Sequence, residues 1–356
     1  MSTIATRRWP VAVLGATGAV GQNFIRLLTG HPWFEVVAVA ASERSAGKTY
    51  REAVNWLDGH LPEPIANMTV VSCEPRFVQA PIVFSALDAA VARDVEPAFA
   101  RAGSMVLSNA KSYRMEPDVP LVVPDVNCGH LALVADQRRT RGWSGGLVTN
   151  SNCAAAVAVM ALAPLHRAFG VRQVFAATMQ AISGAGYPGV PSLDIMGNVI
   201  PYIGDEEPKI ETEVLKILGA LNGSVISPAT IAISAHANRV PVRHGHTVCM
   251  SIAFDRKAGA DEALAVLREW KGDAMVRGMP SAPPSPLIVR DEPNRPQPAK
   301  DLDAGNGMSA TIGRVRADPL LDIKLVALGH NIVLGAAGAS VLNAELLVSQ
   351  GLVAEG

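Results

Sequence analysis

Cysteine and long apolar runs are scarce in this sequence. It has 4 cysteines in 356 residues, and none stands in a Cys-x-x-Cys spacing. This argues against a disulfide framework and a zinc site, and favours the reducing cytoplasm. The longest apolar run, residues 154–165, is interrupted by Pro164 and is too short to span a membrane. Residues 1–10 are polar and short, unlike a signal peptide. We therefore expect a cytoplasmic protein with no membrane segment.

Charge of one sign is scarce as well. Charged residues make up 18% of the chain and the formal net charge is -1. This argues against a surface for nucleic acid or anionic membranes, although a local basic patch could still bind phosphate. Hydrophobic residues make up 49%, which indicates a chain that buries a core. A length of 356 residues exceeds one simple core, so we expect two domains that share an interface.

What the sequence does have begins with a glycine-rich turn. An apolar run at 11–14 leads into Gly15-x-x-Gly18-x-x-Gly21, and helical spacing follows. Between a strand and a helix, such a turn brings backbone N–H groups onto a pyrophosphate. A structural turn is the alternative. Further apolar runs alternate with helical segments and predict a Rossmann-like, doubly wound α/β domain; they lie at 34–41, 82–86 and 105–107.

The loop after the run at 34–41 carries hydroxyl and basic side chains. An NAD site places an acidic residue there for the ribose, whereas an NADP site uses basic and hydroxyl groups for the 2′-phosphate. Ser42, Arg44, Ser45 and Lys48 therefore favour NADP. Glu43 must then point away from the cofactor, and an exposed polar loop is the alternative interpretation.

The pattern changes after about residue 150. Strand-like runs at 173–179, 231–242 and 247–254 predict a mixed sheet with helices on one face. Residues 280–298 hold seven prolines. We interpret this segment as an extended connector or as an arm that reaches a neighbouring subunit.

One cysteine stands apart by its position. Cys153 follows the polar run Asn150-Ser-Asn152 and precedes a strongly helix-forming run, so it should begin a helix. There the helix dipole and free N–H groups would lower the pKa of the thiol and receive an oxyanion. A buried inert cysteine is the alternative, and we keep that interpretation for Cys73, Cys128 and Cys249.

Three motifs in order resemble one enzyme family. They are Ser151-Asn-Cys-Ala154, Gln180 with Ser183-Gly-Ala-Gly186, and Arg239-Val-Pro-Val-Arg-His-Gly-His246. Together they resemble the aspartate-semialdehyde dehydrogenases, in particular the archaeal and fungal branch. Leu334 and Asp88 depart from the family pattern. Supporting stretches run through nearly the whole chain, at 44–48, 108–115, 198–203, 206–209 and 335–338.

The resemblance implies three catalytic residues. Cys153 would be the acyl-enzyme nucleophile, and Gln180 would position the substrate beside it. His246 would be the general acid and base, because a histidine pKa near neutrality allows a proton to be accepted and returned. A satisfied core histidine is the alternative for His246. The His244-x-His246 spacing also raises a metal site with His236, but too few ligands are present and we expect no metal.

Four further residues would bind the substrate by the same resemblance. Arg239 would hold the α-carboxylate as a bidentate pair, and Glu206 would meet the α-ammonium. Lys209 and Arg114 would hold the acyl phosphate or inorganic phosphate. For Glu206 and Lys209 the alternative is a solvated helix start, where such charge runs are common.

The resemblance also implies NADP as the cofactor and a two-domain arrangement. A Rossmann-like NADP-binding domain would span 1–150, completed by about 325–356. An α+β catalytic and dimerisation domain with a mixed sheet would span 151–324, in a homodimer or homotetramer. The implied cofactor contacts are Gly15, Thr17, Gly18, Ala19, Val20, Ser42, Arg44, Ser45, Ser85, Ser183, Gly184 and Asn331.

The activity implied is NADPH-dependent reductive dephosphorylation of L-aspartyl-4-phosphate to L-aspartate 4-semialdehyde, through a thioester on Cys153, in aspartate-family amino-acid biosynthesis. Two related reductases stay open, acting on N-acetyl-glutamyl phosphate or on malonyl-CoA. A malonyl site would have no need of Glu206. A non-catalytic NADP sensor is the alternative from another class, but it should have lost Cys153 or His246, and both are present.

Overall fold

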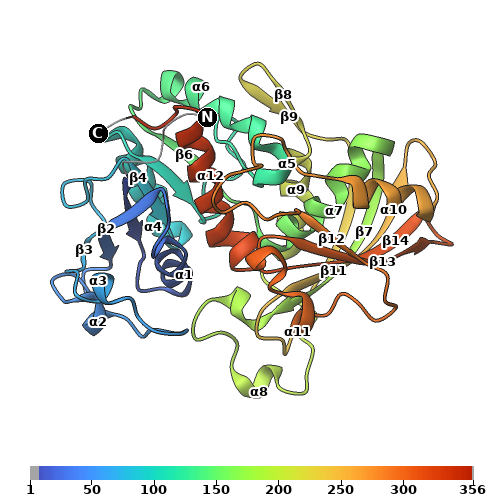
Figure 1. The fold of residues 1–356 in the computed structure, drawn as a ribbon, viewed down its shortest axis with the longest axis horizontal. Coiled ribbons are helices and arrows are strands. Elements are labelled where there is room, and N and C mark those ends of the chain that lie inside the picture. The colour runs from blue at the N-terminus through green and yellow to red at the C-terminus, as the bar shows by residue number, and fades with distance from the viewer. Residues whose placement is uncertain (1–7, 355–356) are drawn as a thin grey trace.

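The computed structural model describes residues 8–354. The molecule is built around two open sheets, one from the N-terminal part of the chain and one from the C-terminal part (Figure 1). The expectation that residues 1–10 are not a signal peptide rests mainly on residues 1–7, which lie outside the described residues. Within residues 8–354, no helix combines the length and the apolar character needed to cross a membrane.

The first sheet has six parallel strands in the order β3-β2-β1-β4-β5-β6. Central strands β4 and β5 are buried along their whole length, which explains their continuous apolar sequences. The strand order reverses between β1 and β4, as in a doubly wound fold, and this confirms the predicted architecture. The strands are β1 (Trp9–Leu14), β2 (Phe34–Ala41), β3 (Val71–Ser72), β4 (Ile82–Ser85), β5 (Met105–Ser108) and β6 (Gly146–Thr149).

Helices pack on this sheet from both ends of the chain. The C-terminal helix α12 (Gly338–Ser349) lies beside the N-terminal sheet in Figure 1. Its Val341 and Leu346 share a core cluster with Phe24 of α1 and Phe84 of β4. The other helices of this part are α1 (Ala19–Leu28), α2 (Tyr50–Ala53), α3 (Glu63–Ala66), α4 (Ala89–Arg101), α5 (Pro124–Asn127), the 3-10 helix η1 (Cys128–Ala132) and α6 (Leu133–Arg141).

The second sheet is mixed, as predicted. Its order is β10-β7-β11-β14-β13-β12, with parallel pairs at β10–β7 and β13–β12 and antiparallel pairs between them. Helices α7, α9 and α10 pack on one face and share its apolar core. The bounds are α7 (Cys153–Phe169), β7 (Val171–Ala181), α9 (Glu206–Ile217), β10 (Ala232–Val240), β11 (His246–Phe254), α10 (Ala260–Glu269), β13 (Ala310–Ala317) and β14 (Ile323–Gly329).

Shorter elements connect these parts. A two-stranded hairpin projects from the end of α9, and a loop with one short helix projects below the second sheet in Figure 1. Between β14 and α12 lies one turn of π-helix, a form that occurs often at functional sites. These elements are η2 (Ile182–Ala185), α8 (Ser192–Ile195), β8 (Ala220–Asn222), β9 (Val225–Ser227), η3 (Ala304–Gly307) and the π-helix η4 (Val333–Ala337).

The proline-rich segment differs from its prediction. Within residues 280–298, Leu287–Arg290 forms β12, an edge strand that pairs in parallel with β13 of the same chain. After a loop over residues 291–297, the helix α11 (Pro298–Asp301) begins at the last proline of the segment. The prolines flank the strand without interrupting it, which is the placement that a sheet edge tolerates. The segment therefore completes the second sheet instead of forming only a connector.

Candidate active site

Cys153 is the first residue of α7, as the sequence predicted. The side-chain oxygen of Asn152 accepts hydrogen bonds from the N–H groups of Ala154 and Ala155 at 2.9 and 3.0 Å, and so caps the helix. On the opposite side, a Cβ added at Gly335 of η4 would lie 2.6 Å from the Cys153 Cβ. Only glycine lets η4 pack this closely, so both parts of the fold meet at the cysteine.

His246 lies against the sulfur. Its Nε2 is 3.1 Å from Cys153 Sγ, and its Nδ1 accepts a hydrogen bond from the Ala181 N–H at 3.1 Å. A neutral imidazole that accepts at Nδ1 carries its proton on Nε2, so the ring presents an N–H to the sulfur. The pairing of β11 with β7 sets this geometry, because His246 begins β11 and Ala181 ends β7.

Burial dominates the electrostatics of this pair. It raises the pKa of the Cys153 thiol to about 12, with Glu206 adding to the shift and Arg114 and Arg239 opposing it. It lowers the pKa of His246 to about 3, and Arg239 lowers that pKa further. Both groups are therefore neutral at pH 7. The expected low thiol pKa and near-neutral histidine pKa are wrong here, because lost solvation outweighs the helix dipole.

Arg239 forms another wall of the site. Its side chain is buried, and its Nη1 donates to the Ala181 carbonyl at 2.7 Å. A Cβ added at Gly184 would lie 2.8 Å from that Nη1 and 3.2 Å from His246 Nε2. Gly184 thus covers the guanidinium and the imidazole together, and a larger residue would fill the space beside both. The structure brings Arg239, His246 and Gly184 into one site.

For Gln180, the structure shows no direct hydrogen bond to Cys153 or His246 among the described residues. It is 1% exposed and lies opposite Arg239 in the pairing of β7 with β10. Its side-chain amide donates to Thr178 Oγ1 at 3.3 Å. The structure therefore puts Gln180 next to the site through its neighbour Arg239, while its own amide is bonded within β7.

The N-terminus of α9 brings a carboxylate and an ammonium to the helix cap. Glu206 begins α9, is 6% exposed and accepts a hydrogen bond from Asn152 Nδ2 at 2.6 Å. Lys209 Nζ lies 3.4 Å from the other oxygen of Glu206. Because this carboxylate raises the pKa of the Cys153 thiol, it lies within electrostatic reach of the sulfur. These contacts fit a binding site better than a solvated helix start.

Glu213 is a residue that the sequence analysis missed. One of its oxygens accepts from Arg114 Nη1 at 3.0 Å, and the other accepts from the Asn152 N–H at 2.5 Å. Arg114 also donates to the Asn109 carbonyl at 2.9 Å, and its buried Nε has no hydrogen-bond partner within the described residues. Glu206 and Glu213 are seven residues apart, which places them on one helix face. The seven-residue spacing from Glu206 is the sequence feature that could have identified Glu213.

The glycine turn lies where the first sheet reverses its strand order. Gly15 has a φ of +69°, and a Cβ added there would lie 2.5 Å from the Ala86 carbonyl oxygen. A Cβ added at Gly21 would lie 2.2 Å from the Gly15 oxygen, so the helix start could not approach the turn with a larger residue. Gly18 is the N-cap of α1, and Thr17, Ala19 and Val20 flank it. This is the geometry that binds a dinucleotide pyrophosphate.

The basic and hydroxyl side chains lie at the same sheet edge. Leu14, the last residue of β1, pairs with Ala40, the residue before the end of β2, so the loop after β2 neighbours the glycine turn. Ser42 and Arg44 are exposed there, and Ser45 is half-buried. Glu43 is exposed as well. The donor set suits a phosphate on the ribose.

Three remaining predicted cofactor contacts have other partners. Ser85 is buried at the end of β4 and donates its hydroxyl to Glu96 at 2.7 Å, so its side chain faces the core. Ser183 Oγ lies 2.9 Å from Asn331 Nδ2 and 3.0 Å from His244 Nδ1. Ser183 and Asn331 therefore form one polar group, and Ser183 precedes Gly184 in the sequence.

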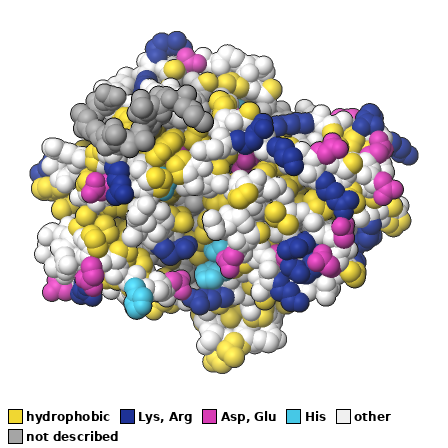
Figure 2. Space-filling view, viewed as in Figure 1, with side chains coloured by type: hydrophobic (Ala, Val, Ile, Leu, Met, Phe, Trp, Pro, Cys, Tyr) yellow, Lys and Arg dark blue, Asp and Glu magenta, His cyan; other side chains and the backbone are white. Residues whose placement is uncertain are grey.

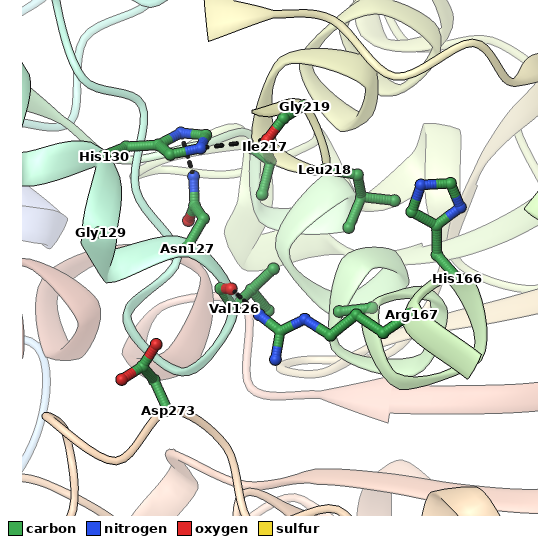
Figure 3. Close-up of a pocket in the computed structure, with 11 residues that line it drawn as sticks. Val126, Asn127, Gly129, His130, His166, Arg167, Ile217, Leu218, Gly219 and Asp273 are labelled. Carbon is green, nitrogen blue, oxygen red and sulfur yellow. Dashed lines mark hydrogen bonds between the residues drawn. The ribbon is translucent and has the colours of Figure 1, made fainter. Parts of the chain in front are cut away.

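The surface away from the site offers less specific chemistry. On the face in Figure 2, basic and acidic side chains are interspersed, and histidine side chains appear near the middle. At the far end of α7, a cavity of about 250 Å³ is lined by His166, Arg167 and Asp273, among others. Figure 3 shows Arg167 between His166 and Asp273, and His130 bonded to Asn127 and Gly219. Among residues 8–354, no group of three His, Cys, Asp or Glu side chains could hold a metal.

Known proteins are similar to this chain over nearly its whole length. Residues 10–134 match the semialdehyde dehydrogenase NAD-binding domain, and residues 162–334 match the semialdehyde dehydrogenase dimerisation domain. The aspartate-semialdehyde dehydrogenase of Archaeoglobus fulgidus is 51% identical over 97% of this chain and 100% of its own. That of Schizosaccharomyces pombe is 47% identical over 96% of this chain and 99% of its own.

A solved structure agrees. The crystal structure of the Candida albicans aspartate-semialdehyde dehydrogenase with NADP has a TM-score of 0.90 and 43% identity, covering 98% of this chain and 100% of its own. These matches confirm the resemblance drawn from the three motifs. The chain belongs to the aspartate-semialdehyde dehydrogenase family.

Proposed function

We propose that this protein catalyses the reversible, NADPH-dependent reductive dephosphorylation of L-aspartyl-4-phosphate to L-aspartate 4-semialdehyde. The observation that carries the proposal is the 3.1 Å contact between Cys153 Sγ and His246 Nε2, with Arg239 beside both. The family membership supports the substrate and the NADP-bound relative supports the cofactor. We place the reaction in aspartate-family amino-acid biosynthesis.

The chain's own residues divide the work. Cys153 attacks the acyl carbon, the C–O bond to phosphate breaks as the C–S bond forms, and the thiol proton leaves with the phosphate as hydrogen phosphate. His246 donates its Nε2–H to the sulfur and stabilises negative charge there, which is needed because burial opposes the thiolate. Arg239 holds the α-carboxylate through its planar fork, and Glu206 receives the α-ammonium.

The phosphate and cofactor sites are assigned on the same basis. Arg114 and Lys209 hold the departing phosphate, and the buried, unpartnered Nε of Arg114 fits an anion at that place. Glycines 15, 18 and 21 leave the close backbone approach that a pyrophosphate needs, and the donors after β2 fit a 2′-phosphate. Bound NADPH supplies the hydride. Gly184 lies beside His246, and Ser183 and Asn331 are bonded to each other nearby, so these three residues would hold the nicotinamide end of the cofactor.

A substrate panel tests the proposal. Purified protein is given NADP, phosphate and one of three aldehydes, namely the semialdehydes of aspartate, N-acetylglutamate or malonate, and the reduced cofactor is followed by absorbance. We expect phosphate-dependent turnover with aspartate semialdehyde. Arg239→Lys keeps the charge but loses bidentate pairing, so its KM for that aldehyde should rise about tenfold or more. The matched control Arg243→Lys changes an exposed arginine paired with Asp58 and should leave KM unchanged. Turnover without phosphate dependence would reject the proposal.

We also propose the domain division and the assembly. Residues 1–150 with about 325–356 form the cofactor-binding unit, and 151–324 form the catalytic and dimerisation unit, in a cytoplasmic homodimer or homotetramer. The chain carries the family's dimerisation domain. Helices cover one face of the second sheet, while Phe175 and Met179 of β7 are 44% and 37% exposed on the other. A second copy packed on that face would bury them, which light scattering of Phe175→Glu against wild type would test.

A further inference from the structure

Helix α9 holds more of the site than its first turn. Glu213, two turns after Glu206, is 2% exposed and bonded on both oxygens. One oxygen binds Arg114, which lies on the loop after β5, and the other binds the backbone N–H of Asn152, the residue before the nucleophile. A single carboxylate thus joins three segments that are far apart in sequence.

The next turn of α9 strengthens the same connection. Lys216 is 5% exposed, and its Nζ donates to the carbonyls of Arg114, Glu116 and Val119 at 2.7, 2.7 and 2.8 Å. Its three donors are therefore used to hold the backbone of the loop that carries Arg114. Glu213 holds the side chain of Arg114, and Lys216 holds its main chain.

One nitrogen of the Arg114 side chain, Nε, is left without a hydrogen-bond partner among the described residues. Nη1 is bonded to Glu213 and Nη2 to the Asn109 carbonyl, while the buried Nε has no hydrogen-bond partner within the described residues. A buried donor without a partner is costly and indicates a ligand. The guanidinium also lies close enough to lower the pKa of the Cys153 thiol. The bond to Glu213 therefore holds a guanidinium that still has one free donor within electrostatic reach of the sulfur.

We infer that Glu213 is a positioning residue for the reaction: its carboxylate sets the phosphate-binding guanidinium of Arg114 and the helix cap before Cys153 in one fixed relation. This rests on the proposed function, because Arg114 is assigned to phosphate there. The acyl carbon must lie at the sulfur while its phosphate lies at Arg114, so the distance between the two binding points decides whether attack is productive. Glu213 contacts Arg114 at one end of that distance and Asn152, the residue before Cys153, at the other.

Charge and position predict opposite effects for its removal. Glu213 is an anion behind a phosphate site, so deleting its charge without moving Arg114 should tighten phosphate binding. Losing the bond that orients Arg114 should weaken it. Glu213→Gln removes both the charge and the bond to Arg114, while its amide oxygen can still accept from the Asn152 N–H, so the direction of the change in KM for phosphate shows which effect is larger.

The experiment measures steady-state kinetics in the oxidative direction with NADP, varying phosphate and L-aspartate 4-semialdehyde separately. For Glu213→Gln we expect KM for phosphate to rise about tenfold, kcat to fall, and KM for the aldehyde to stay within about twofold. Glu211→Gln is the matched control: Glu211 lies on the same helix and accepts from the Ala235 N–H on β10, so its kinetics should not change. Glu213→Asp, which keeps the charge but shortens the side chain, should show the same pattern more weakly.

A double-mutant cycle completes the test. If Glu213 acts through Arg114, adding Glu213→Gln to Arg114→Ala should not raise KM for phosphate further. An unchanged or lowered KM for phosphate in Glu213→Gln and Glu213→Asp, or full additivity in the cycle, would overturn the inference. Wild-type turnover that needs no phosphate would instead reject the proposed function, so the two failures are distinct.

Discussion

The two halves of the candidate site are held in different ways. Around Cys153 the polar side chains are buried and bonded to other protein groups: His246 to Ala181, Arg239 to Ala181, and Glu206 to Asn152. Around the glycine turn, Ser42 and Arg44 are exposed on a loop. The proposed substrate side is held by hydrogen bonds within the protein, whereas the proposed cofactor side exposes its charged groups to solvent.

This difference between buried and exposed groups indicates which region controls the chemistry and which controls cofactor affinity. A buried group with fixed partners keeps its orientation during a reaction, so changes there should act mainly on turnover. An exposed group on a loop binds a ligand without setting the position of others, so changes there should act mainly on affinity.

Cys153→Ser should have the largest effect. Serine has no comparably nucleophilic state, so turnover should fall by roughly 10⁴-fold or more. Binding of NADP, followed by fluorescence titration, should be retained because the cofactor side is held separately. Cys249→Ser is the control and should stay active, since Cys249 lies in the middle of β11, away from the helix terminus. Substantial turnover in Cys153→Ser would show that Cys153 is not the nucleophile.

His246→Asn should lower kcat by roughly 10²–10⁴-fold with KM little changed, because the shorter amide no longer reaches the sulfur. Burial lowers the pKa of His246 to about 3, so its neutral form persists as the pH rises from 3. The kcat of the wild type should therefore show no His246 break between about pH 5 and 8. His244→Asn, which alters the neighbour of Ser183, should cost less. The reverse order of the two mutants would show that His246 was the wrong choice.

Arg44→Ala should change cofactor affinity without changing chemistry. Loss of one charged contact to the 2′-phosphate should cost about 1.5–3 kcal/mol, or roughly ten- to a hundredfold in affinity for NADP. Use of NAD, which lacks that phosphate, should be unchanged. Kinetics with both cofactors for wild type and Arg44→Ala measure this directly. If wild type used NAD and NADP equally well, the assignment of this loop would be refuted.

Glu96→Gln should have the smallest effect, on stability alone. Burial raises the pKa of Glu96 from 4.5 to about 7, so its ionisation destabilises the folded protein as the pH rises through that range. The glutamine variant cannot ionise. Its free energy of unfolding should therefore gain on wild type between about pH 4.5 and 7, by at most about 3 kcal/mol, and the difference should stay constant above. Chemical denaturation at a series of pH values measures it, and a difference that does not vary with pH would contradict the burial effect.

Local patterns in the sequence predicted most of the fold and the main anchor of the site. The strand 34–41 was predicted with the bounds of β2, and the helix was predicted to begin at Cys153, because apolar runs and capping residues act over a few neighbours. β12 was missed because its prolines, which mark a loop by composition, lie beside the strand and leave its hydrogen bonds intact. The proline content of a segment does not show whether a short strand lies between the prolines.

Contacts between segments far apart in the chain could not be predicted from local sequence patterns. The pairing of Glu213 with Arg114 joins positions 99 apart, and Cys153 packs against Gly335 of η4, from the far end of the chain. The direction of the Cys153 pKa shift was therefore wrong, since the helix terminus is a local feature and the lost solvation is not. The side chain of Ser85 likewise turns to Glu96, a residue of the following helix.

A thioester on Cys153 would add the mass of one aspartyl group to the protein, which mass spectrometry can detect. Wild-type protein and Cys153→Ala are each mixed with L-aspartyl-4-phosphate without NADPH, quenched in acid and digested. The wild type should gain one aspartyl group on the peptide that contains Cys153, with release of one phosphate, and Cys153→Ala should gain none. No adduct on the wild type, or an adduct on the peptide of Cys249 or Cys73 instead, would contradict the account.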